Sequence, residues 1–149
     1  MSGPRRALKP LWTCPLCGRA FANRNQSHAC GRHELEAHFE GLSPDVRALF
    51  DAFLAALQEI GPVTVLPQKT RIAFQVRMSF AQVTPRRDGL EGHFVLARRI
   101  DDPRFLAIES FSPRNHLHRF RIDHLEEIDA EMRGWMREAY AVGEQRHLE

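Results

Sequence analysis

Segments in which apolar and polar residues alternate follow one another from residue 70 to residue 122, and this pattern restricts the fold more than any other feature. The five segments read TRIAFQVRM, FAQVT, HFVLAR, FLAIESF and HLHRFRI. The breaks PRRDGLEG, DDPR and SPRN between some of them are rich in turn-forming residues. Alternation with period two is typical of β-strands, and short turns connect antiparallel neighbours. The sequence therefore predicts a mostly antiparallel β-meander of about five strands.

An amphipathic helix is expected before the strands. Apolar side chains recur at helical spacing over residues 44–60. Ser43 is a suitable N-cap, and Pro44 is favourable at the first helical position. Gly61, followed by a proline, ends the pattern. These signals predict one helix of about four turns ahead of the sheet.

Two further helices complete the predicted fold. One is expected to start near Asp123, because Asp123 and Glu126 have the spacing of a capping box and an apolar stripe follows. A shorter one is expected over about residues 32–40. The fold class is then α+β, with helices packed on one face of the meander. We expect a small zinc-binding module with its short helix over residues 1–40 and an α+β domain over residues 41–147.

Composition and charge exclude several classes of protein. The chain has 149 residues, of which 43% are hydrophobic, and a net charge of +2. No apolar run approaches the roughly 18 residues of a transmembrane helix. The opening MSGPRRALKP lacks the apolar stretch of a signal peptide. The sequence therefore predicts a cytoplasmic protein with no membrane partner.

All three cysteines lie close together, in WTCPLCGRAFANRNQSHACGRH. Thiolates and imidazoles are preferred zinc ligands, and four of them complete a closed tetrahedral site, which is structural rather than catalytic. We expect a structural zinc ion bound by Cys14, Cys17, His28 and Cys30. His33 is the main rival for the fourth position. A redox-active C-x-x-C pair and cysteines without any ligand remain alternatives.

Basic residues are concentrated in the strand region. Residues 64–122 contain eleven Lys and Arg against five Asp and Glu, whereas residues 123–149 contain three against eight. In the first strand, Ile72, Phe74, Val76 and Met78 are expected to face the helices, with Arg71 and Arg77 facing away. The candidate anion- or ligand-binding residues are Lys69, Arg71, Arg77, Arg86, Arg87, Arg98 and His118. The competing interpretation is a solvated face whose arginines pair with the acidic last helix.

Two classes of function fit these residues. The first is a zinc-stabilised binding domain whose basic sheet face binds nucleic acid or another phosphorylated anion. The second is an enzyme acting on an anionic small molecule in a pocket near Lys69, Arg98 and His118. A buried, hydrogen-bonded core histidine is the competing explanation for His118. No Ser/His/Asp set, nucleophile elbow or carboxylate pair is visible, so the sequence favours a binding domain and predicts no catalytic residue.

The motifs WTCPLCGRAF, NQSHAC, KTRIAF, FAQVTPRR and HRFRI, with LF in the first long helix and EAY near the end, also carry a resemblance. Over about residues 10–143 the chain resembles an uncharacterised bacterial domain family of unknown function with an N-terminal CPxCG…HxC zinc-binding head. The resemblance implies a fold and a zinc site, and it implies no activity.

Overall fold

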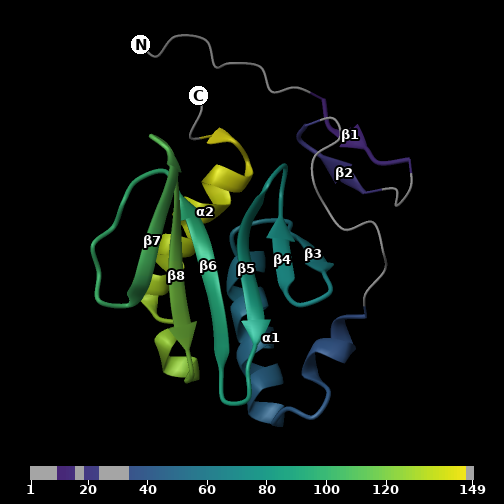
Figure 1. Ribbon diagram of the computed structural model, residues 1–149, viewed down its shortest axis with the longest axis vertical. Helices are drawn as coiled ribbons and strands as arrows, with labels where there is room; N and C mark the ends of the chain where they lie inside the picture. Colours follow the sequence, from purple (N-terminus) through teal and green to yellow (C-terminus); the bar gives the residue numbers. More distant parts are fainter. Residues whose placement is uncertain (1–9, 16–18, 24–33, 147–149) are drawn as a thin grey trace.

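The computed structural model describes residues 10–15, 19–23 and 34–146 (Figure 1). A small antiparallel sheet pairs β1 (Trp12–Thr13) with β2 (Ala20–Phe21). The main sheet has six strands: β3 (Thr64–Pro67), β4 (Ile72–Gln75), β5 (Ser79–Pro85), β6 (Leu90–Leu96), β7 (Phe105–Ser112) and β8 (Asn115–Ile122). The helical segments are η1 (Leu35–Phe39), α1 (Pro44–Gln58), η2 (Leu125–Glu127) and α2 (Ala130–Gly143), where η denotes a 3₁₀ helix. The predicted α+β class is confirmed.

The strand order differs from a simple meander. It runs β3-β4-β5-β6-β8-β7, and every neighbouring pair is antiparallel. The connection after β6 therefore passes the position of β8 and leads into β7 at the edge (Figure 1). The sequence prediction also missed β3, which has only four residues and ends at Pro67. Proline cannot donate to a ladder and is tolerated at a sheet edge, which is where β3 lies.

The first strand is shorter than its alternating pattern indicated. β4 ends at Gln75, and Val76 and Met78 are only half-buried rather than part of the core. The backbone N–H groups of Arg77 and Met78 both donate to the carbonyl oxygen of Gly143, at 2.9 Å each. The chain thus turns to satisfy a carbonyl group at the end of α2, and this contact interrupts the strand.

Helix α1 agrees with its sequence signals. The Ser43 hydroxyl accepts a hydrogen bond from the Asp45 N–H at 3.1 Å, and Pro44 occupies the first turn. The short helix expected before it is the 3₁₀ helix η1, which packs Phe39 against Phe50 of α1. Local capping chemistry and apolar periodicity are enough to specify this region.

Helix α2 starts later than predicted. Glu127, not Glu126, closes the turn after β8, and its carboxylate accepts from the N–H groups of Asp123 and His124 at 2.9 and 3.1 Å. These contacts form η2, a single 3₁₀ turn. The helix proper begins after Asp129, whose carboxylate accepts from the Met132 N–H at 2.9 Å. The predicted start near Asp123 was wrong because two capping sequences follow each other here.

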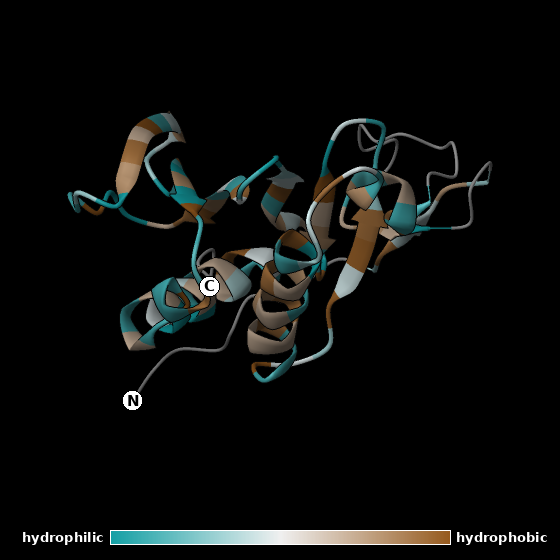
Figure 2. Ribbon diagram, turned by 90° about the horizontal axis from the view of Figure 1, so that it is seen from below, coloured by the Kyte–Doolittle hydropathy of each residue, from teal (hydrophilic) through white to brown (hydrophobic). Residues whose placement is uncertain are grey.

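Both α-helices pack on one face of the main sheet (Figures 1 and 2). The core between them is aromatic: Phe53 of α1 lies 5.5–5.9 Å, between ring centroids, from Phe74, Phe94 and Phe120 of the sheet. All four rings are almost completely buried. Because no described helix covers the opposite face of the sheet at β5, β6 and β8, polar side chains on that face are available to a ligand.

The small N-terminal sheet contacts the end of β4. The Gln75 amide nitrogen donates to the Ala20 carbonyl at 2.6 Å, and the Ala22 N–H donates to the Arg77 carbonyl at 3.1 Å. Cys14 lies in the β1–β2 turn and is buried. Of the predicted zinc ligands only Cys14 is among the described residues; Cys17, His28, Cys30 and the rival His33 lie outside them. The described residues contain no group of three or more candidate metal ligands.

Candidate anion-binding site

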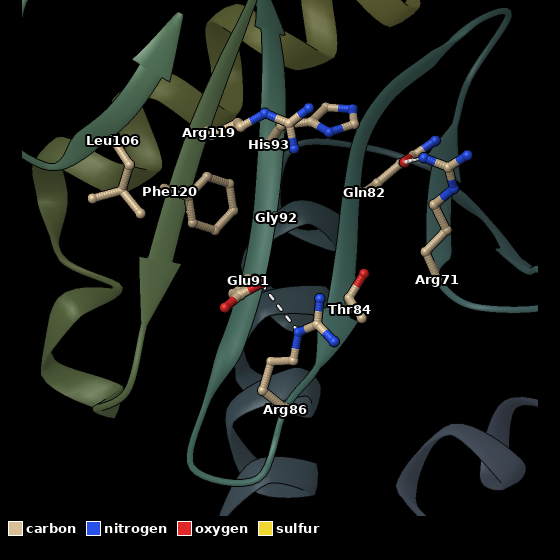
Figure 3. Close-up of a pocket in the computed structure, with 10 residues that line it drawn as sticks. All are labelled: Arg71, Gln82, Thr84, Arg86, Glu91, Gly92, His93, Leu106, Arg119 and Phe120. Carbon is tan, nitrogen blue, oxygen red and sulfur yellow. Dashed lines mark hydrogen bonds and ion pairs between the residues drawn. The ribbon is translucent and has the colours of Figure 1, made fainter.

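The open face of the sheet carries a row of polar side chains across three strands. In β6, Leu90, Phe94 and Leu96 are completely buried against the helices. Strand alternation therefore directs His93 to the open face. His93 pairs with Gln82 of β5 on one side and with Arg119 of β8 on the other. The ladder register thus places an amide, an imidazole and a guanidinium side by side (Figure 3).

These residues line a hollow of about 180 Å³ (Figure 3). Arg71, just before β4, and Arg86, just after β5, extend it on the β5 side, and Leu106 of β7 lies on the opposite side. Gly92 lies in its middle, where a Cβ atom would be 2.3 Å from the Gln82 carbonyl oxygen and 3.1 Å from Phe120 Cζ. Only glycine avoids these contacts, so the close approach of β5, β6 and β8 depends on Gly92.

The arginines of the hollow are only partly neutralised. Arg71 donates to the uncharged Gln82 side chain at 3.1 Å. Arg119 has its carboxylate partner, Glu109, at 3.5 Å, and both side chains are about half exposed. Arg86 contacts Glu91 at 3.0 Å, but Glu91 is shared with Arg121 at the same distance. The hollow therefore has three guanidinium groups and one carboxylate along its lining.

The surroundings of His93 lower the pKa of its imidazole. Burial, followed by the charges of Arg119 and Arg71, lowers its pKa from 6.5 to about 4. The imidazole is therefore neutral at pH 7, and it carries one donor and one acceptor nitrogen. A neutral ring between two guanidinium groups is an arrangement that an incoming anion would stabilise, because the anion offsets the repulsion that now keeps the proton off.

The other predicted basic residues are dispersed. Lys69 lies in the β3–β4 connection, and Arg77 donates to the Gln145 side chain beyond α2 at 3.0 Å. Arg87 lies in the β5–β6 turn, beside the start of α1 rather than in the hollow. Arg98 forms two hydrogen bonds with Glu138 of α2, at 2.9 and 3.1 Å. Arg98 therefore pairs with the acidic last helix, as one of the two interpretations of the excess of basic residues predicted.

His118 is a core residue. Its side chain is fully buried on the helix-facing side, with its ring 4.7 Å from the ring of Phe105. The Ile100 N–H donates to Nε2 at 3.0 Å, so Nδ1 carries the proton and donates to the His116 carbonyl at 2.9 Å. Burial is the largest cause that lowers its pKa, which keeps the ring neutral. These contacts support the interpretation of His118 as a buried, hydrogen-bonded core histidine.

The structure does not bring Lys69, Arg98 and His118 together. Strands β4, β5 and β6 separate the β3–β4 connection from β8. Neighbouring strands lie about 4.8 Å apart, so Lys69 and His118 are separated by roughly 14 Å or more across the sheet. Arg98 contacts α2 instead. The three residues predicted for an enzymatic pocket therefore do not form one site.

Sequence reasoning found Arg71 and Arg86 and missed their partners in the hollow. His93 and Gln82 are unremarkable in the sequence, because each is one polar residue in an alternating strand. The available signal was strand alternation. His93 and Arg119 each lie between residues that face the core, so both side chains are expected on the opposite face of the sheet. Using it required the β6–β8 pairing, which the meander prediction did not contain.

The comparisons with known proteins leave the chemistry of this hollow open. No curated protein and no solved structure matched the chain. One family model matched, described as a domain of unknown function (DUF5655), and it covers residues 35–143. This span includes η1, both α-helices and the whole main sheet, and it excludes the small sheet that carries Cys14. The chain belongs to the DUF5655 family, and its residues 35–143 form the α+β unit described above.

Proposed function

We propose that this protein is a zinc-stabilised binding domain that holds a phosphorylated anion, such as a nucleic acid, on the open face of its main sheet. One observation carries the proposal: His93 stands between Arg71 and Arg119 in a hollow rich in guanidinium groups. Arginine donors match phosphate oxygens in geometry as well as in charge.

The arrangement is a poor one for stability alone. The long Arg119–Glu109 contact joins two half-exposed side chains and contributes little. A half-buried imidazole that cannot take up a proton at neutral pH gains nothing from its two basic neighbours. An anion in the hollow converts these repulsions into attractions. The same residues are therefore better explained by binding than by folding.

The zinc part of the proposal rests on the local chemistry of the N-terminal sheet. Cys14 is buried in the β1–β2 turn, where its N–H donates to the Arg19 carbonyl at 2.8 Å. The C-x-x-C spacing is typical of zinc sites because it allows two thiolates to bind one ion, and in this proposal Cys17, His28 and Cys30 supply the remaining ligands. The zinc ion would hold this head together and take no part in a reaction. Reduced thiolates of this kind fit a reducing compartment such as the cytoplasm.

Binding is tested with 5′-phosphorylated oligonucleotides of DNA and RNA, single-stranded and duplex, labelled at the 3′ end and followed by fluorescence anisotropy at low salt. Wild-type protein should bind, and its affinity should fall as the salt concentration rises, because binding releases counterions. Arg71→Gln with Arg119→Gln should weaken binding at least about tenfold, since charge-assisted hydrogen bonds are lost.

The matched control removes two arginines from the other face. Arg133 and Arg137 belong to α2, and Arg133 forms an ion pair with Glu59. Arg133→Gln with Arg137→Gln should leave affinity within about twofold of wild type. Equal losses in the two double variants would mean that net charge, rather than the open face, drives binding. No binding of any oligonucleotide or of inorganic phosphate would leave the solvated-face interpretation in place.

A further inference from the structure

The hollow on the open sheet face is small. It spans β5, β6 and β8, with Leu106 of the edge strand β7 on one side. Its volume of about 180 Å³ exceeds that of a single phosphate group but leaves little space for more than a small attached group. A site of this size is suited to one phosphate group with a small substituent rather than to several phosphates of a chain.

The charges within the hollow are also unevenly placed. The guanidinium group of Arg119 lies beside the imidazole of His93, and that of Arg71 lies beyond Gln82; burial and then these two charges lower the pKa of His93. The carboxylate of Glu91 projects from the same strand two residues away and pairs with Arg86 (Figure 3) and with Arg121. An anion beside His93 meets two cations, whereas a second phosphate extending along β6 would approach Glu91. The arrangement favours one concentrated negative charge over a chain of single charges.

The groups around His93 can be named strand by strand. On β5 its neighbour is Gln82, on β8 it is Arg119, and Arg71 adds charge from the start of β4. Glu109 of β7 acts through Arg119, and Glu91 is the acidic neighbour on β6 itself. None of the contacts described for these residues places a carboxylate directly on the imidazole. The ring is therefore neutral at pH 7, and an anion beside it would favour its protonation.

We propose that the hollow binds a terminal phosphate monoester as its dianion, and that His93 takes up a proton from solvent and donates a hydrogen bond to a phosphate oxygen. This inference rests on the proposed function and narrows it to one ligand class. The proton comes from water or buffer, and no covalent bond is formed or broken. Arg71 and Arg119 hold the dianion, and His93 distinguishes it from a diester, which carries one charge.

Isothermal titration calorimetry tests the proposal with phenyl phosphate as the monoester and methyl phenyl phosphate as the diester. Titrations at pH 7 in buffers of different ionisation enthalpy measure proton uptake directly. A monoester is mostly dianionic at this pH, so it contributes few protons itself. We expect tighter binding of phenyl phosphate, with net proton uptake, and we expect the His93 imidazole resonances in wild-type protein to move toward their protonated positions.

The variant His93→Gln keeps a hydrogen-bonding side chain and cannot take up the proton. It should abolish the uptake and reduce the preference for the monoester by about tenfold, the value of a charged hydrogen bond. Comparable affinity for the two probes, or proton uptake that persists in His93→Gln, overturns the inference and leaves phosphate binding intact. Absence of binding by both probes and by oligonucleotides overturns the inference and the proposed function together. The resonances of wild-type His93 report the outcome even if the variant folds poorly.

Discussion

His93 makes the stability of the folded protein depend on pH, and the substitution His93→Gln isolates this dependence. Its pKa is about 4 in the folded protein and 6.5 ordinarily. Above pH 6.5 the imidazole is neutral in both folded and unfolded chains, so stability is fully present. As the pH falls from 6.5 toward 4, the unfolded chain takes up a proton that the folded chain does not. Stability is therefore lost over this window.

The size of the effect follows from the same two values. At pH 5 the unfolded imidazole is almost entirely protonated and the folded one is mostly neutral, which corresponds to about 2 kcal/mol by linkage. Water and salt enter the open hollow and screen the neighbouring arginines, so we expect about 1–2 kcal/mol in practice. His118 shifts stability in the same direction, because its pKa is also lowered. The comparison must therefore be made between wild type and variant.

Urea unfolding at pH 7.5 and at pH 5 measures the difference. The free energy of unfolding of wild-type protein should fall by about 1–2 kcal/mol more than that of His93→Gln between these two pH values. His38→Gln, which removes a histidine from η1, is the control and should retain the wild-type dependence. Parallel pH dependence in wild type and His93→Gln would refute the burial of His93 beside two guanidinium groups.

Three other predictions concern single substitutions. Gly92→Ala should lower the free energy of unfolding by about 1–3 kcal/mol, because the added methyl group meets the Gln82 carbonyl; thermal unfolding that matches wild type would contradict the described packing. His118→Leu should also destabilise by about 1–3 kcal/mol, since the Ile100 N–H is left unpaired, and a urea titration with an unchanged midpoint would argue against the hydrogen-bonded core histidine. Cys17→Ser should remove the metal that elemental analysis finds in wild-type protein purified without chelator, and a wild-type protein without zinc would disprove the zinc site.

The parts of the fold that sequence reasoning found are those specified locally. Helix α1 is defined by Ser43, Pro44 and an uninterrupted apolar stripe, so its limits needed no tertiary information. The start of α2 was misplaced because Asp123 and Asp129 both begin plausible capping sequences. Only the contacts of Glu127 with the turn after β8 distinguish them. Propensity alone does not resolve such competition.

The parts that escaped prediction depend on contacts distant in sequence. The placement of β8 between β6 and β7 depends on how the sheet packs. The residues that connect β6 to β7 carry no sequence signal that predicts it. The anion-binding site could not be predicted for the same reason. Charge counting led to Arg71 and Arg86, but the alignment of Gln82, His93 and Arg119 exists only once the strand order is known.

The central claim, an anion site on the open sheet face, is tested most directly by locating phosphate on the protein. A titration of ¹⁵N-labelled wild-type protein with inorganic phosphate at low salt and pH 7 reports the position of binding through amide and imidazole chemical shifts. We predict saturable shifts centred on Gln82, His93 and Arg119, with little change along α2. Shifts confined to other surfaces, or no saturable shift at millimolar phosphate, would contradict the claim.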